Sequence, residues 1–201
     1  MISKTFQKVF LSRNIQRTYF RGLRKKLTLR EKIFFSYKIS NIVLCSKIFY
    51  FCKNIAIFLP FDGEIDTNIL VSELWKLKYN IFLPVVYSYH KKILLFSKYC
   101  PNTCFVSNRY NILEPISNSE DYLSCCNMDI IFFPLVAFDR LGYRLGMGGG
   151  FYDNILHNWR SKNFLPIGLA YDFQLANKII PAPWETFLPA IFTPTKFWIW
   201  K

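Results

Sequence analysis

The chain has 201 residues and a formal net charge of +13, with 52% hydrophobic and 19% charged residues. This composition excludes a globally disordered chain, and the length suits one domain spanning residues 1–201. No apolar run reaches the ~18–20 residues of a membrane-spanning helix, and no signal-peptide pattern opens the chain. We therefore expect a cytoplasmic protein that does not engage a membrane.

Positive charge is concentrated at the N-terminal end. Residues 1–53 contain 13 of the 26 Lys and Arg residues and one acidic residue, Glu31. Three functional interpretations fit this pattern: a nucleic-acid- or anion-binding arm, a transit peptide, or helices whose basic face meets a phosphorylated ligand. Charge alone favours a plain solvated surface about as strongly as these three together.

The six cysteines favour a reduced chain. None belongs to a CxxC pair, and Cys125 and Cys126 are adjacent, which does not suit a disulfide framework. His90 and His157 are the histidines of the chain, and neither has zinc-finger spacing. We therefore expect no structural metal site.

The first predicted elements are two helices. Residues 13–27 predict an amphipathic helix whose apolar stripe recurs every four residues, at Ile15, Tyr19, Leu23 and Leu27. Basic residues follow the opposite side, at Arg13, Arg17, Arg21 and Arg24, and we expect the last two to be solvated together with Lys25 and Lys26. Thr28 and Glu31 then form a capping-box pattern, which predicts a second helix to about Ser46.

Strands and helices alternate along the rest of the chain. Short apolar runs predict strands at 55–59, 81–83, 93–96, 129–133 and 166–170, with 190–192 as the last. Pro84 is expected to end the second strand, Asp66 to cap a helix after the first, and a further helix to span 151–160. Residues 98–127 are loop-rich. This order indicates an α/β fold, a three-layer sandwich with a mostly parallel central sheet, preceded by two N-terminal helices.

The most informative segment is the glycine-rich stretch 139–153, between a buried strand and a predicted helix. Glycines let backbone N–H groups turn toward an anion, a helix N-terminus adds positive charge, and Arg144 can bind a phosphate bidentately. Neither a GxGxxG fingerprint nor a GK[ST] ending is present. Phosphate binding is favoured over a merely tight turn. Asp153 fits a magnesium ligand and a helix-dipole carboxylate equally well.

At this segment the sequence resembles the 5-formyltetrahydrofolate cyclo-ligase family. The resemblance is carried by residues 133–139, Gly142 and residues 144–153. Further segments match in order and spacing, at 58–67, 111–115, 168–172 and 183–185. The similarity runs from about Leu11 to the C-terminus.

The resemblance implies an ATP-dependent ring closure. Such an enzyme converts 5-formyltetrahydrofolate, with or without a polyglutamate tail, to 5,10-methenyltetrahydrofolate and releases ADP and phosphate. ATP phosphorylates the formyl oxygen, N10 attacks the resulting N5-iminium phosphate, and phosphate leaves. This chemistry needs positioning and charge neutralisation more than an acid–base pair. The resemblance also implies a monomer that binds no nucleic acid.

The family pattern assigns the nucleotide to two parts of the chain. It places ATP phosphates against Arg13 and Arg17, although relatives usually carry Lys at the first position, and Arg changes the contact geometry. It also assigns ATP to a run in the glycine-rich segment, namely Arg144, Leu145, Gly146, Met147, Gly148, Gly149, Gly150, Phe151 and Tyr152. Arg144 and Tyr152 are the implied catalytic residues.

Metal and folate positions follow from the same pattern. Asp153 and Glu185 are the implied Mg²⁺ ligands, and Glu185 stands where most relatives have Asp. The folate-binding residues would be Leu59, Glu64, Tyr110, Met147 and Phe151. Ordinary core packing is the alternative role for Leu59, and a turn role is the alternative for Glu64.

Two other functions remain open at this point. The first is a basic nucleic-acid-binding protein that uses residues 13–38, which predicts salt-sensitive binding without small-molecule turnover. The second is a family member that has kept the fold and changed its ligand, for which the departures at Arg13 and Glu185 leave room.

Overall fold

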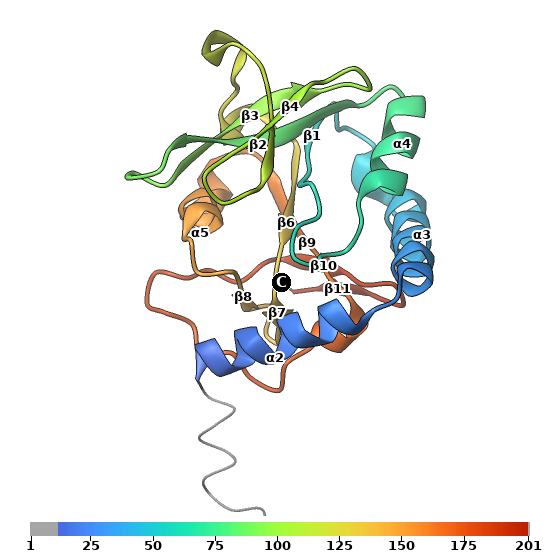
Figure 1. The fold of residues 1–201 in the computed structure, drawn as a ribbon, viewed down its shortest axis with the longest axis vertical. Coiled ribbons are helices and arrows are strands. Elements are labelled where there is room, and N and C mark those ends of the chain that lie inside the picture. The colour runs from blue at the N-terminus through green and yellow to red at the C-terminus, as the bar shows by residue number, and fades with distance from the viewer. Residues whose placement is uncertain (1–11, 201) are drawn as a thin grey trace, which may run out of the picture.

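A seven-stranded sheet forms the centre of the protein in a computed structural model, which describes residues 12–200 (Figure 1). Its spatial order is β11-β10-β9-β6-β1-β2-β3. The strands are β1 (Asn54–Ala56), β2 (Asn80–Ser88), β3 (Ile93–Tyr99), β6 (Ile130–Pro134), β9 (Leu165–Leu169), β10 (Ala190–Phe192) and β11 (Phe197–Ile199).

The interior of the sheet is parallel and its two edges are antiparallel. β1 pairs in parallel with β2 and β6, and β9 pairs in parallel with β6 and β10. The edge strands β3 and β11 run antiparallel to their neighbours β2 and β10. Parallel strands need helical crossovers that cover both faces, so the predicted α/β class and mostly parallel sheet are confirmed.

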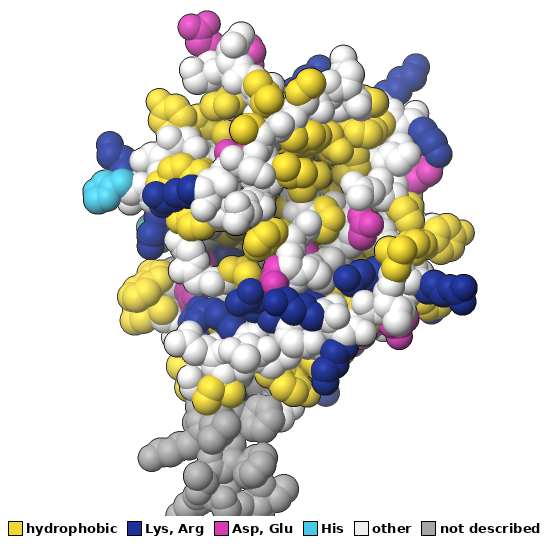
Figure 2. Space-filling model, in the orientation of Figure 1, with side chains coloured by type: hydrophobic (Ala, Val, Ile, Leu, Met, Phe, Trp, Pro, Cys, Tyr) yellow, Lys and Arg dark blue, Asp and Glu magenta, His cyan; other side chains and the backbone are white. Residues whose placement is uncertain are grey.

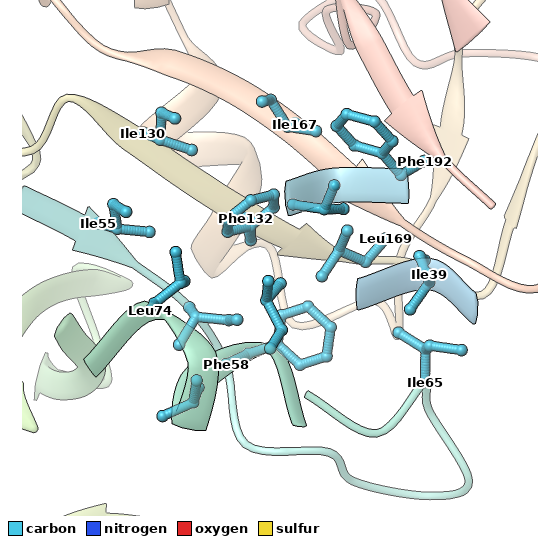
Figure 3. Close-up of a cluster of buried hydrophobic side chains, with 14 of the residues drawn as sticks. Ile39, Ile55, Phe58, Ile65, Leu74, Ile130, Phe132, Ile167, Leu169 and Phe192 are labelled. Carbon is cyan, nitrogen blue, oxygen red and sulfur yellow. The ribbon is translucent and has the colours of Figure 1, made fainter. Parts of the chain in front are cut away.

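Alternate residues of β6 supply the cores on the two faces of the sheet. Ile130 and Phe132 join the core under helices α3 (Leu29–Cys45) and α4 (Asn68–Lys76), where they meet Ile39 of α3 (Figure 3). Ile131 and Phe133 point to the other face, in the core under the short helix α5 (Phe151–Leu156). Both faces of β6 are therefore buried, as its continuous apolar sequence requires.

The first helix, α2 (Arg13–Lys26), begins where expected but buries a different face. Its buried residues are Gln16, Phe20 and Arg24, whereas Ile15 and Tyr19 of the predicted apolar stripe are exposed. The predicted stripe is therefore only partly buried, at Leu23 and Leu27, and the prediction was wrong for its first half because polar partners elsewhere in the chain also bury Gln16 and Arg24. The capping box of α3 is confirmed: Thr28 Oγ1 accepts from Glu31 N–H and the Glu31 carboxylate accepts from Thr28 N–H.

Several element boundaries differ from the expectations. β1 ends at Ala56 rather than at residue 59, and β2 continues through Pro84 to Ser88. Thr67 rather than Asp66 occupies the N-cap position of α4, although Asp66 Oδ1 accepts from Asn68 N–H. α5 ends at Leu156, so the helix predicted to reach residue 160 is shorter, and a 3₁₀ turn at Trp159–Ser161 follows it. The strand β10 is followed by β11 and so is not the last.

Two small hairpins flank the sheet. In the segment predicted as loop-rich, β4 (Phe105–Ser107) pairs with β5 (Leu113–Pro115). Glu114 Oε1 ties this hairpin to the sheet by accepting from Val86 N–H at 2.9 Å. The second hairpin consists of β7 (Ala137–Phe138) and β8 (Arg144–Leu145), directly after β6.

Two further expectations concern the whole chain. All six cysteines are free in the structure, in agreement with a chain without disulfides. Within residues 12–200, no helix combines the length and the apolar character needed to cross a lipid bilayer. That residues 1–201 form one domain stays a prediction.

Candidate active site

The site lies beside β1, where the connections to the following strands turn to opposite sides of the sheet. From β1 the chain passes to β2 on one side, whereas β6 lies on the other side of β1. Such a switch point opens a crevice at the carboxyl ends of the strands. A pocket of about 400 Å³ occupies this position, between Leu59 after β1 and Leu135 after β6. We call it the apolar pocket because most of its lining side chains are hydrophobic.

The β7–β8 hairpin carries the next part of the site into this crevice. Asp139 is buried in its turn, where its Oδ1 accepts from the N–H groups of Leu141 and Tyr143. Asp139 Oδ2 also accepts from Ile179 N–H at 3.0 Å, which fixes the hairpin to the C-terminal segment. The hairpin therefore delivers Arg144 at a rigid position.

Arg144 is a buried cation at the edge of the apolar pocket. Its Nη2 donates to Asp153 Oδ1 at 2.5 Å, and its guanidinium lies 5.7 Å from the ring centroid of Phe133. Burial lowers the pKa of Arg144, and the neighbouring Asp153 opposes this change. Arginine nevertheless stays protonated at neutral pH. The site thus holds a fixed positive charge in a largely dry environment.

Residues 146–150, which we call the glycine loop, follow β8 directly. Gly148 and Gly150 have φ angles of +98° and +78°, a conformation that strongly favours glycine. Arg17 of α2 reaches this loop, where its Nε donates to the carbonyl oxygen of Gly146 at 2.8 Å. The helix α5 that follows the loop has six residues. It is therefore too short for its N-terminus to add the positive charge that was expected to favour an anion.

A second pocket of about 450 Å³ lies on the other side of the glycine loop, and we call it the cationic pocket. It is lined by Arg13, Arg17, Lys92, Asp153 and Glu185, together with Gly146, Gly148 and Gly150. The two pockets therefore share the alternate glycines and Asp153. Figure 2 shows Lys and Arg side chains in a row across this face, with hydrophobic side chains gathered above them.

The two predicted metal ligands line the cationic pocket, and each is paired with an arginine. Asp153 accepts from Arg144, and Glu185 accepts from both terminal nitrogens of Arg13. Burial acts to raise the pKa of Glu185, but hydrogen bonds from Arg13 and Ala182 N–H hold it below its usual value. Among residues 12–200 no third His, Cys, Asp or Glu joins them. Two carboxylates fit Mg²⁺ when phosphate oxygens complete its coordination.

Glu64 is the buried acidic group of the apolar pocket, which Glu114 and Asp153 also line. It is 9% exposed, and its Oε2 accepts from Phe61 N–H at 3.2 Å. Burial raises the pKa of Glu64 to about 7, although Arg24 Nη1, which lies 3.7 Å from Glu64 Oε1, acts in the opposite direction. Glu64 can therefore exchange a proton near neutral pH.

Arg24 is the largest departure from the expected site. It was predicted to be solvated, but it is fully buried, and its Nη2 donates to Asp62 Oδ2 at 2.8 Å. Arg21 binds the same carboxylate, with 2.6 Å between Nε and Oδ2. The hydrogen bonds from Arg21 and Arg24 lower the pKa of Asp62 to about 2, against the effect of burial. The partner Asp62 lies 38 positions after Arg24, so helical periodicity cannot reveal this burial.

Aromatic side chains form one wall of the apolar pocket. Tyr110 on the β4–β5 loop lies 6.1 Å from Phe151, and Tyr89 lies 5.6 Å from Tyr110, measured between ring centroids. Arg109 covers the Tyr89 ring at 3.6 Å. Tyr152 lies 5.1 Å from Phe133, and burial raises the pKa of Tyr152 beyond its ordinary range. Tyr152 is therefore a neutral hydroxyl at physiological pH.

The structure brings nearly all sequence-predicted site residues to these two pockets. The exception is Leu145, whose side chain is fully buried in a core with Phe20 and Val136 and lines neither pocket. Sequence reasoning missed Lys92, which reaches the cationic pocket from the β2–β3 turn. No local motif surrounds Lys92, so no sequence signal would have found it.

Comparisons with known proteins agree with the resemblance found in the sequence. A model of the 5-formyltetrahydrofolate cyclo-ligase family matches residues 12–194. The chain is 44% identical to a 5-formyltetrahydrofolate cyclo-ligase of Escherichia coli (strain K12), over 73% of this chain and 80% of that protein. It is 47% identical to one of Haemophilus influenzae, over 66% of this chain and 71% of that protein. The fold is similar to a 5,10-methenyltetrahydrofolate synthetase of Aquifex aeolicus, with a TM-score of 0.79, 26% identity and coverage of 93% of this chain and 92% of that one.

Proposed function

This chain belongs to the 5-formyltetrahydrofolate cyclo-ligase family and is a ligase, and we propose that it closes 5-formyltetrahydrofolate to 5,10-methenyltetrahydrofolate with ATP and Mg²⁺. One observation carries the proposal: an apolar pocket and a cationic pocket meet at a single glycine loop. A ring system can occupy the first while a phosphate chain occupies the second. Their shared wall is where a phosphoryl group would pass from one ligand to the other.

The apolar pocket suits a folate. Leu59 and the aromatic wall of Tyr110 and Phe151 offer flat apolar surface to the ring system, and Met147 borders the same pocket. Glu64 is the acidic group that would accept hydrogen bonds from pterin N–H donors. A buried carboxylate among apolar side chains would orient such a ligand because polar groups are few in this pocket.

The cationic pocket suits the phosphates of ATP. Arg13 and Arg17 approach from α2, and backbone N–H groups of the glycine loop are accessible because Gly148 and Gly150 carry no side chains. Asp153 and Glu185 would hold Mg²⁺, which supplies charge neutralisation to the phosphates. Arg13 and Arg144, which now bind these carboxylates, would then face phosphate oxygens.

The chemistry follows from this arrangement. The formyl oxygen attacks the terminal phosphorus of ATP, the bond from that phosphorus to ADP breaks, and an N5-iminium phosphate forms. N10 then attacks the activated carbon and releases its proton to water, and the C–O bond breaks to release phosphate. Arg144 lines the wall between the pockets and would neutralise charge on the transferred group, while the neutral Tyr152 hydroxyl would donate a hydrogen bond there.

The remaining expectations concern the cellular location, the oligomeric state and the binding partners of the enzyme. We propose a cytoplasmic monomer that acts on folates with or without a polyglutamate tail and binds no nucleic acid. The basic helix α2 supports the last point, since Arg13, Arg21 and Arg24 are engaged by carboxylates of the same chain. These pairs leave fewer cations for a polynucleotide.

The test is direct turnover. Purified protein with 5-formyltetrahydrofolate, ATP and Mg²⁺ should form the methenyl product, followed by absorbance, and omission of ATP should abolish it. Arg144→Gln should lower kcat by about 100-fold or more, because it removes a buried donor at the transferred group. Arg140→Gln on the same hairpin is exposed and should leave kcat unchanged. Absence of product from folded wild-type protein would refute the proposal and favour a family member with another ligand.

A further inference from the structure

Every second residue of the glycine loop faces a cation from a different element. A Cβ on Gly146 would lie 3.0 Å from Arg144 Nη1, and one on Gly148 would lie 3.7 Å from Arg17 Cζ. A Cβ on Gly150 would lie 3.1 Å from Lys92 Nζ. The three glycines thus leave room for three positive charges beside the loop. The first two cations belong to the site already described, whereas Lys92 has no role in it.

The backbone of Lys92 is held in an unfavourable conformation at this position. Its φ angle is +52°, in the left-handed region that costs a residue with a Cβ on the order of 1 kcal/mol. Asn154 of α5 donates its side-chain amide to the carbonyl oxygens of Lys92 and Lys91, at 3.2 and 3.5 Å. The β2–β3 turn is therefore tied to the helix that follows the glycine loop. Strain of this kind persists only where the surrounding structure enforces it.

The charges of the cationic pocket are unequally compensated. Arg13 is paired with Glu185 and Arg144 with Asp153. Arg17 instead donates to the oxygens of Gly146 and Asn14, and no carboxylate of residues 12–200 forms a salt bridge with Arg17 or Lys92. Arg17 and Lys92 therefore line the pocket without an ion-pair partner among residues 12–200. A bound anion with several negative charges would supply one.

We infer that Lys92 is a phosphate-binding residue, which holds the phosphate chain of the nucleotide from the Gly150 side while Arg17 holds it from the Gly148 side. This inference rests on the proposed use of ATP. Lysine suits the position because its ammonium group is a compact charge on a flexible stem. It can stay in contact with the phosphates while the terminal one is transferred. The β2–β3 turn thereby becomes part of the nucleotide site, although it lies some 50 residues before the glycine loop.

Calorimetric titration of the protein with ATP and Mg²⁺ tests this inference without relying on turnover. Lys92→Met keeps the length of the side chain and removes its charge, and it should raise the Kd for ATP by about 5- to 20-fold. The Kd for 5-formyltetrahydrofolate should change less than about twofold, since the apolar pocket does not include Lys92. Lys92→Arg should restore most of the ATP affinity. Lys91→Met, on the same turn, is the matched control and should bind ATP as wild type does.

Each alternative result is informative. Unchanged ATP affinity in Lys92→Met, with a wild-type protein that binds ATP and turns over, would overturn the role of Lys92 and leave the proposed function intact. An equal loss of affinity for both ligands would also overturn it, since Lys92 would then act only through the shape of the turn. If the wild-type protein binds folate but no ATP, the proposed function itself fails, and the inference about Lys92 fails with it.

Discussion

Glu64 illustrates how a single side chain acquires its properties from burial. It lies in the apolar pocket, where burial raises its pKa from 4.5 to about 7. The folded state therefore binds the proton of Glu64 more tightly than the unfolded chain does. This group favours folding fully below pH 4.5, and its contribution is lost as the pH rises toward and through about 7.

We predict that Glu64→Gln flattens this part of the pH dependence of stability. The free energy of unfolding should fall by up to about 3 kcal/mol between pH 4.5 and pH 8 in wild type through this group, and by clearly less in the variant. Chemical denaturation at a series of pH values measures the difference. Glu120→Gln, at an exposed position, is the control and should follow wild type. Identical slopes for Glu64→Gln and wild type would contradict the assignment.

At the scale of the element, α2 is held by charge as well as by apolar packing. Its fully buried Arg24 and its partly exposed Arg21 converge on Asp62, which follows β1 and Phe58. The same helix presents Arg13 and Arg17 to the cationic pocket. Burying a cation is favourable only when its countercharge is already in place, so α2 can dock in one position along the site.

We predict that Arg24→Met and Asp62→Asn each cost about 3 kcal/mol of unfolding free energy, because each leaves a buried charge without its partner. The double variant should cost less than the sum of the two, which a double-mutant cycle measures. The stabilisation through Asp62 is present above pH 3.8 and is lost as the pH falls through about 2. Lys26→Met on the exposed side of α2 is the control. Simple additivity would show that the pair does not act as a unit.

At the scale of the whole molecule, the two pockets are joined by one structural element. The glycine loop and Asp153 line both of them, so a ligand that orders the loop from one side prepares it for a ligand on the other. The β7–β8 hairpin, α2 and the β2–β3 turn meet at this loop from three directions (Figure 1). The site is therefore a property of the assembled fold rather than of any one segment.

We predict positive coupling between the two ligands. A non-hydrolysable ATP analogue with Mg²⁺ should lower the Kd for 5-formyltetrahydrofolate by about fivefold or more, and by linkage folate should tighten the analogue to the same extent. Calorimetric titrations in both orders measure this. Gly148→Ala would strain the loop at its positive φ angle and should weaken both ligands and reduce the coupling. Independent binding of the two ligands would contradict a shared loop.

Local sequence information by itself determined much of this protein. The capping box at Thr28 and the apolar runs of β1, β6 and β9 specify their elements because hydrogen bonding and periodicity act between near neighbours. The alternation of strands and helices determined the α/β class, and the glycine-rich motif located the site. The family resemblance also identified residues far apart in the chain, such as Leu59 and Glu185, which line the two pockets.

Tertiary structure alone decided the rest. Arg24 is buried because Asp62 meets it across the fold, and Lys92 reaches the pocket because Asn154 fixes its turn beside the glycine loop. β2 continues through Pro84 because β1 ends at Ala56, which pairs with Phe82, so that β3 is the strand that pairs with β2 at Pro84. Each of these outcomes depends on which distant group lies opposite a residue, and that information exists only when the chain has folded.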